Sequence, residues 1–470
     1  MVVTRREFLR SVAGGMVALA TPLECFSDSG LAAKPNIILC MADDMGWGDP
    51  GFNGNPIIKT PNLDAMAAAG LRLKRFYSAA PVCSPTRGSC LTGRHPYRYG
   101  IFFANVGHLR KEEVTLAEAL KTQGYTTGHF GKWHLGTLTP DYSGKGARRK
   151  PRPNYMTPAM SGFDEWFSTE FAVATWDPYD PAVFHGKKYD VRSLYWHNGK
   201  NVAEKLEGDD SKIIMDRVVP FVQKAAKQKK PFFAVVWFHA PHAPVVAGPQ
   251  YRKMYSQYSE DEQHYYGCIT ALDDQVGRLR AQLREIGVAD NTLLFFCSDN
   301  GPEGKDGRKG RFRGSAGPFR GRKRSLLEGG VRVPAVFEWP KKIKTGRVTE
   351  VPCCTSDYFP TVLDVLGFKM QGQPEPIDGV SLLPLIEGRM SERPRPIAFQ
   401  SSSQVSLVDN RYKIYSNNKG RTYALYDLIE DPGETKDLAK EKPDVLGVMT
   451  KELDKWRASC SNSLAGGDYG

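Results

Sequence analysis

The sequence lacks the cysteine patterns of a disulfide framework or of a small metal-binding module. Its nine cysteines are an odd number, they follow no repeated spacing, and no two of them are arranged as C-x-x-C. Internal repeats, low-complexity tracts and nucleic-acid-binding motifs are also missing. We therefore expect a globular chain without a nucleic-acid partner, whose function depends on residues dispersed along the sequence.

Long hydrophobic runs are missing as well. Residues 11–20 are modestly apolar but contain glycine, and no segment has the ~20 apolar residues that a membrane span needs. This stretch follows a twin arginine within Thr4–Arg10, an order that favours a Tat export signal over a plain basic tail. We expect residues 1–33 to be recognised by the Tat machinery and cleaved near Ala33. The mature protein would then be periplasmic or extracellular, without a transmembrane anchor.

The composition of the 470 residues is globular, with 41% hydrophobic and 11% aromatic side chains. This length predicts two domains, one large and one small. Lys and Arg number 64 against 52 Asp and Glu, which leaves a formal charge of +12. Such an excess favours an anionic partner, such as an anionic lipid or a sulfated or phosphorylated polymer.

Three short apolar runs predict buried strands, at residues 36–41, 232–238 and 293–297. Amphipathic helices with clear start and stop signals are expected at residues 61–70, 115–124 and 265–286. Strands that alternate with helices predict an α/β fold, with a mostly parallel central sheet flanked by helices.

The pattern of apolar and polar residues changes near residue 376. Alternating segments around Tyr412 and Tyr426 precede a helical pattern at residues 445–456, which is typical of a small α+β unit. We therefore divide the mature chain into a catalytic domain, 34–375, and a C-terminal α+β subdomain, 376–470.

Polar residues follow each of the three predicted strands. Asp43 and Asp44 follow the first, His242 follows the second, and Asp299 with Asn300 follows the third. Ligands of parallel sheets bind beyond the carboxyl ends of the strands, so these residues are expected to converge. Their oxygens suit Ca²⁺ or Mg²⁺ better than zinc or copper. Each acidic pair taken alone could equally be a turn or a helix cap.

The most informative string begins at Cys83. Residues 83–87 read C-S-P-T-R and continue as G-S-C-L-T-G-R. A free cysteine is usually a small buried hydrophobic residue. This whole string, however, resembles the signature at which type I sulfatases have a cysteine oxidised to formylglycine. Thr86 is a mild departure, because the family often has Ser or Ala there.

Further strings resemble the same family. They are G-K-W-H-L-G at 131–136, F-H-A-P-H-A-P at 238–244, the segment 317–334 with Lys323, and L-Y-D-L with D-P-G-E at 425–434. The resemblance covers nearly the whole mature chain and is of the arylsulfatase or N-acetylgalactosamine-6-sulfatase kind. It implies the fold of the alkaline phosphatase superfamily, with a smaller C-terminal sheet domain.

The resemblance also implies a nucleophile and a metal. A maturation enzyme would convert Cys83 to formylglycine (3-oxoalanine), whose hydrate combines attack on sulfur with an easy release of sulfate. Arg87 would brace this residue. One Ca²⁺ would be held by residue 83 together with Asp43, Asp44, Asp299 and Asn300.

The remaining implied roles concern the substrate. Lys132, His242 and Lys323 would bind the sulfate oxygens and neutralise developing charge, and His242 or Lys323 could assist departure of the alcohol. His134 would accept a proton, and His108 would line the substrate pocket.

These implications predict an enzyme that hydrolyses sulfate esters. A run rich in Lys and Arg, 303–324, lies between the metal segment and Lys323 and favours a sulfated carbohydrate as the substrate. Two alternatives stay open. One is a phosphate or phosphonate monoester hydrolase of the same superfamily, and the other is a non-catalytic binder of anionic glycans.

Overall fold

The computed structural model describes residues 34–145, 149–180, 190, 192, 194–304 and 310–469. The residues from Pro35 to Gly470 form a single compact unit. The predicted export signal and three residues of the basic run, Lys305, Arg308 and Lys309, lie outside the described residues. Within the described part of the chain, no helix combines the length and the apolar character needed to cross a membrane.

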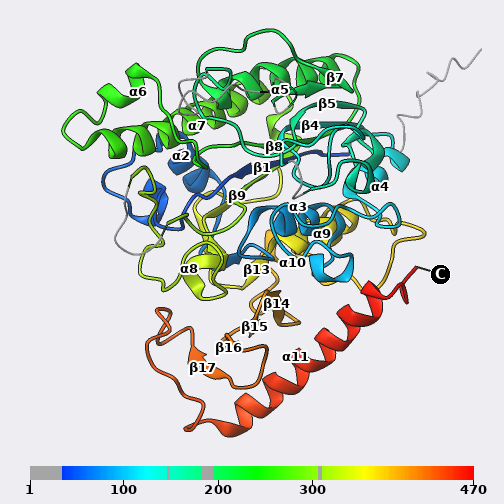
Figure 1. The fold of residues 1–470 in the computed structure, drawn as a ribbon, viewed down its shortest axis with the longest axis vertical. Helices are drawn as coiled ribbons and strands as arrows, with labels where there is room; N and C mark the ends of the chain where they lie inside the picture. The colour runs from blue at the N-terminus through cyan, green and yellow to red at the C-terminus, as the bar shows by residue number, and fades with distance from the viewer. Residues whose placement is uncertain are drawn as a thin grey trace, which may run out of the picture. The chain divides into compact units, whose positions relative to one another are not determined.

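A mixed sheet forms the centre of the Pro35–Gly470 unit (Figure 1). Its described strands follow the order β12 (Arg347–Thr349), β2 (Leu71–Leu73), β11 (Ala335–Glu338), β9 (Thr292–Ser298), β1 (Asn36–Ala42), β8 (Phe232–Trp237), β4 (Thr126–Lys132), β5 (Glu165–Thr169), β6 (Trp196–His197) and β7 (Lys200–Asn201). The strands from β9 to β5 run parallel, whereas β11 and β6 are antiparallel to them. The predicted strands are therefore adjacent, and the prediction of a parallel sheet centre is confirmed.

Helices cover both faces of this sheet, as in the α/β fold predicted from the sequence. One set of helices packs on one face of β1, β8 and β9: α2 (Pro61–Ala69), α5 (Asp210–Lys227) and α7 (Glu260–Glu285). A second set packs on the opposite face: α3 (Cys83–Thr92), α4 (Leu116–Thr122) and α9 (Tyr358–Val365). Because both faces are covered, the strands are apolar on both sides.

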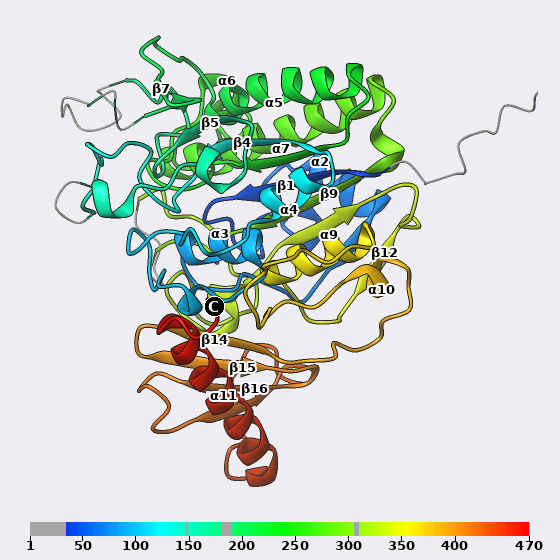
Figure 2. The ribbon, with the colours of Figure 1, turned by 90° about the vertical axis from the view of Figure 1, so that its right-hand side faces the viewer.

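Two smaller sheets complete the unit. One consists of β10 (Arg332–Val333), β3 (Phe76–Tyr77) and β13 (Cys353–Cys354), and the other is the antiparallel sheet β14 (Ile397–Ser401), β15 (Gln404–Val408), β16 (Tyr412–Ser416) and β17 (Ala424–Asp427). The long helix α11 (Pro443–Leu464) packs against the antiparallel sheet (Figure 2). The short helices are α6 (Pro249–Lys253), α8 (Glu328–Val331) and α10 (Leu383–Ile386).

Candidate active site

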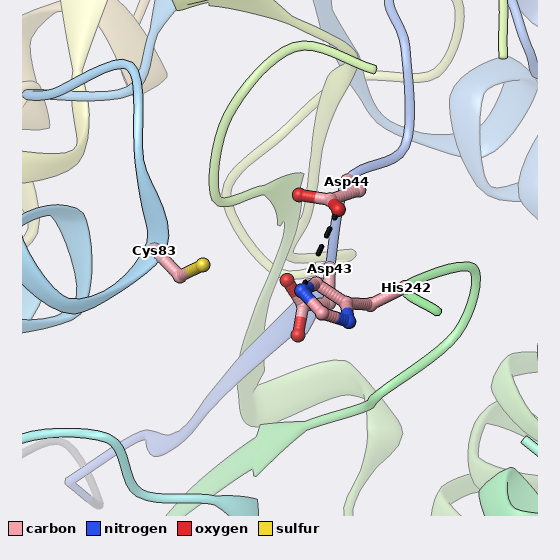
Figure 3. A group of neighbouring side chains, drawn as sticks. All are labelled: Asp43, Asp44, Cys83 and His242. Carbon is pink, nitrogen blue, oxygen red and sulfur yellow. Dashed lines mark ion pairs between the residues drawn. The ribbon is translucent and has the colours of Figure 1, made fainter. Parts of the chain in front are cut away.

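The polar residues predicted at the strand ends converge at the carboxyl edge of the sheet. Asp43 and Asp44 follow β1, and His242 lies in the loop after β8. One oxygen of each aspartate, the Sγ of Cys83 and a ring nitrogen of His242 all lie within 4.8 Å of one another. Figure 3 shows the thiol of Cys83 pointing toward the aspartates from the other side of the site.

Cys83 is the first residue of α3, a helix whose residues are all buried. The helix ends at Gly93, whose φ of 70° is the left-handed conformation that glycine adopts without strain. Burial raises the pKa of the Cys83 thiol, and the opposing charges of Lys132 and Lys323 do not overcome it. The unmodified side chain is therefore a protonated thiol, which is a poor nucleophile.

Arg87 lies one helical turn after Cys83 and joins α3 to three strand ends. Its Nη2 lies 2.6 Å from Asp299 Oδ2 and 3.5 Å from Asp43 Oδ2, and its Nη1 donates to the carbonyl of Lys132 at 3.2 Å. The guanidinium also lies 5.1 Å from the centre of the Trp237 ring. Because Arg87 and both aspartates are fully buried, this residue fixes the relative positions of the motif helix and the acidic side chains.

Two lysines enter the same cluster. Lys132 Nζ lies 2.6 Å from Asp43 Oδ2, and Lys323 Nζ lies 2.7 Å from Asp44 Oδ1. Burial would lower the pKa of Lys323, but the surrounding acidic groups, Asp44 foremost, together outweigh it and the pKa is raised. His242 Nε2 is 3.7 Å from Asp44 Oδ2, and burial together with Lys323 lowers the pKa of His242 to about 3. The site therefore places two lysines beside a neutral imidazole.

The acidic side chains fit a hard divalent cation. Asp299 Oδ1 accepts the N–H of Asp44, and Asn300 Nδ2 donates to Asp44 Oδ1. Within the described chain, no hydrogen-bond donor reaches Asp43 Oδ1 or Asn300 Oδ1, although both atoms are buried. A buried oxygen without a partner is costly. Oxygen atoms that converge in this way are ligands that Ca²⁺ accepts.

His134 follows β4 and is held from two sides. Its N–H donates to the carbonyl of Glu170 at 3.1 Å, and its Nε2 lies 2.9 Å from Asn105 Oδ1. An amide oxygen that faces Nε2 favours the tautomer of the neutral imidazole with the proton on Nε2 and the lone pair on Nδ1. Nδ1 is buried without a hydrogen-bond partner among the described residues. It is therefore the atom that can accept a proton.

Steric constraints require glycine at the first position of the G-K-W-H-L-G string. Gly131 has a φ of 97°, and a Cβ at this position would lie 1.9 Å from the carbonyl oxygen of Trp237. Only glycine lets β4 pass so close to β8 just before Lys132 and His134.

Sequence comparison identifies the family. Residues 35–368 match the profile of the family described as Sulfatase, and residues 317–459 match the profile "N-sulphoglucosamine sulphohydrolase, C-terminal". The chain belongs to the sulfatase family. This confirms the resemblance to the type I sulfatases of the alkaline phosphatase superfamily, and the sulfatase is accordingly a sulfuric ester hydrolase.

Three similar proteins illustrate the relationship. N-acetylgalactosamine-6-sulfatase of Homo sapiens is 35% identical over 389 residues, which cover 78% of this chain and 68% of the relative. Arylsulfatase G of Rattus norvegicus is 30% identical and covers 94% of this chain and 91% of its own length. The crystal structure of Ps i-CgsB in complex with k-i-k-neocarrahexaose is 30% identical, with a TM-score of 0.77 over 90% of this chain and 92% of that one.

Two residues in the surroundings of His134 were not predicted from the sequence. Asn105 contacts His134, and Arg149 lies in the loop that follows the G-K-W-H-L-G string. Both are loop residues without a distinctive spacing, so no sequence signal selects them. His108, which was predicted to line the pocket, is half-buried. Burial lowers the pKa of His108 more than the hydrogen bond with Asn154 raises it. His108 does not belong to the cluster around Cys83.

The described arginines of the basic run contact other groups of the sulfatase itself. Arg324 makes two contacts of 2.6 and 2.8 Å to the Glu303 carboxylate, and Arg311 donates to the carbonyl of Val245 at 2.7 Å. Arg320, Arg322 and Arg313 likewise contact protein carbonyls or Asp261. The described part of the run therefore gives little support to a surface that binds a sulfated polymer.

Proposed function

We propose that this sulfatase hydrolyses a sulfate ester on a sulfated carbohydrate, using formylglycine made from Cys83 and one bound Ca²⁺. The observation that carries the proposal is the single buried cluster in which Cys83, two lysines and the acidic side chains meet. A carbohydrate substrate is supported by two similar proteins whose names mention a sugar. These are N-acetylgalactosamine-6-sulfatase and Ps i-CgsB, whose structure was determined in complex with k-i-k-neocarrahexaose.

The nucleophile and the metal would have separate tasks. The hydrate of a formylglycine supplies two hydroxyl groups on one carbon, one for attack on sulfur and one whose deprotonation releases sulfate. Bound Ca²⁺ supplies positive charge that stabilises an alkoxide and polarises the ester. Its ligands would be residue 83 and the oxygens of Asp43, Asp44, Asp299 and Asn300.

The other side chains bind sulfate and move protons. Lys132 and Lys323 place two ammonium groups beside Cys83 and would hold the sulfate oxygens while negative charge moves to the leaving oxygen. His134 Nδ1 would accept the proton of the second hydroxyl, and His242 would assist departure of the alcohol. Arg87 would keep residue 83 in line with the metal ligands. We keep His108 as a residue of the outer substrate pocket.

The proposal also includes an export signal and a division of the chain into two domains. Residues 1–33 would direct export through the Tat machinery, which carries folded proteins, to the periplasm or the exterior. A cytosolic maturation enzyme would therefore act on Cys83 before export. The catalytic domain would span 34–375, and the C-terminal subdomain 376–470.

The experiment that tests the proposed function compares ester types. The enzyme purified from its native host is assayed with an aryl sulfate, the matching aryl phosphate and a panel of defined sulfated saccharides. We expect the sulfate ester to be preferred by at least about 100-fold in kcat/KM, with desulfation of at least one saccharide. The mass of the peptide that holds residue 83 is measured on the same sample. A preference for phosphate, or an unmodified cysteine in active enzyme, would reject the proposal.

Metal removal provides a further prediction. Dialysis against a calcium chelator is expected to lower kcat by at least about tenfold, and added Ca²⁺ should restore it better than Mg²⁺. Calcium should also raise the melting temperature, because a ligand at 100 times its Kd stabilises the native state by about 2.7 kcal/mol. The Asp299→Asn variant should lose most of this thermal shift. An unchanged melting temperature in the native enzyme would contradict a calcium site.

A further inference from the structure

The backbone of His134 is in a conformation that needs external support. His134 has a φ of 58° and Asn105 has a φ of 64°, and both residues are in the left-handed region that few non-glycine residues adopt. Such conformations persist only where the surroundings determine them. Two loops provide the support: the one that carries Asn105 contacts the ring, and the one that carries Glu170 accepts the backbone N–H.

Arg149 joins these two loops. Its Nη2 donates to the carbonyl of Gly107 at 2.9 Å, two residues after Asn105. Its Nη1 lies 3.9 Å from Glu170 Oε1, which also accepts the hydroxyl of Ser143 at 2.6 Å. One guanidinium thus reaches both segments that hold His134.

The burial of Arg149 between these two loops is energetically unfavourable. Its side chain is 1% exposed, and burial lowers the pKa of Arg149. In the described part of the structure, no acceptor forms a hydrogen bond with its Nε or Nη1. A buried charge with unsatisfied donors contributes little to stability and costs desolvation. Its contacts are therefore better explained by the geometry they impose on His134 than by stability.

Arg149 also belongs to the electrostatic surroundings of the imidazole. Burial lowers the pKa of His134, and the charges of Lys132, Arg149, Arg87 and Lys145 lower it further. Burial and these four charges together keep the ring neutral, as a proton acceptor requires.

We propose that Arg149 is a positioning residue, which ties the Asn105 loop to Glu170 and thereby fixes the ring of His134 in its proton-accepting orientation. This inference rests on the proposed function, in which His134 accepts a proton. Because Arg149 is proposed to act through His134, its loss should affect the chemical step and leave substrate binding in place.

The test measures kcat and KM for an aryl sulfate in Arg149→Met and Arg149→Lys. We expect kcat of Arg149→Met to fall about 10- to 100-fold, with KM within about threefold of the native value. Arg149→Lys should show a smaller loss of kcat with the same KM, and it replaces Arg149→Met if that variant does not fold. The matched control is Arg152→Met, in the same segment, where the side chain is 85% exposed and native kinetics are expected.

A double-mutant cycle with Asn105→Ala tests the route. If Arg149 acts through Asn105, then Arg149→Met should cost less than about threefold in the Asn105→Ala background. The positioning role would be overturned if the fold-losses of kcat in the two single variants multiplied in the double variant. It would also be overturned if Arg149→Met raised KM and left kcat native. His134→Ala separates this failure from that of the proposed function. Native activity in His134→Ala would reject the proton acceptor itself, whereas loss there with native kcat in Arg149→Met would reject only the role of Arg149.

Discussion

Replacement of Cys83 with alanine is expected to lower kcat for sulfate esters by at least about 10⁴-fold. Alanine cannot be converted to an aldehyde, so the variant would lack the group that attacks sulfur, while the lysines would still bind sulfate and the acidic side chains would still hold Ca²⁺. The measurement is the turnover of an aryl sulfate, together with the binding of inorganic sulfate. Binding should persist while turnover is lost.

Two further variants make this result specific. Cys90→Ala is the matched control, because Cys90 is buried in the same helix α3, and its kcat should stay within about threefold of native. Cys83→Ser keeps one hydroxyl and is expected to accumulate protein that carries a sulfate group, since a simple ester cannot expel sulfate as a geminal diol can. Turnover by Cys83→Ala close to the native rate would contradict a nucleophile at this residue.

The elements that could be predicted from the sequence are those with an apolar signature on both faces or a complete cap. The strands β1, β8 and β9 were predicted because burial between two helical layers requires apolar residues throughout. For α4, the capping box of Thr115 and Glu118 marks the start in both sequence and structure. Where neither signal is present, as in the two-residue strands β6 and β7, no pattern is long enough to be read.

Helix ends were predicted less well, for a physical reason. The helix α7 begins at Glu260, before the predicted 265, because its first turn is polar and is stabilised by a capping box of Ser259 and Glu262. The helix α11 continues to Leu464, past the predicted end at 456, where its polar turns are held by Arg98 through Ser459 and Ser463. Both extensions depend on side-chain hydrogen bonds, which hydrophobic periodicity does not detect.

In the candidate site, too, some residues could be predicted from the sequence and others could not. Asp43, Asp44 and Asp299 could be predicted because strand ends of a parallel sheet meet at one edge. Asn105 could not, because its contact with His134 depends on how a loop folds back across 29 residues. The basic run was interpreted from charge alone, and the structure shows that its described arginines bind acceptors of the protein. Charge patterns in a sequence do not distinguish internal from external partners.

A buried lysine connects the antiparallel sheet to the rest of the protein. Lys413, on β16, places its Nζ 2.9 Å from both Glu328 Oε1 and Glu434 Oε1, and all three side chains are 0% exposed. Glu328 begins α8, outside the sheet, and also accepts the hydroxyl of Tyr77 at 2.9 Å. Burial would raise the pKa of both carboxyl groups. Burial is the largest influence at both sites, but at Glu328 the charges of Lys413 and Arg332 together outweigh it and the pKa is lowered, whereas at Glu434 the charge of Lys413 does not and the pKa is raised.

Lys413→Met is therefore expected to destabilise the protein by about 3–5 kcal/mol, because it leaves two buried carboxylates without their shared cation. The melting temperature should fall clearly, whereas Lys436→Met, at a 64% exposed ion pair, should change stability by less than about 0.5 kcal/mol. In Lys413→Met, loss of the lysine charge raises both carboxyl pKa values above those of the native protein, although Arg332 stays 3.4 Å from Glu328 Oε2, so the folded variant binds more protons than the folded native protein does. The deficit should therefore shrink as the pH is lowered through the folded pKa values. A deficit that is small, or that grows on acidification, would mean that the two carboxylates do not depend on Lys413 for their burial.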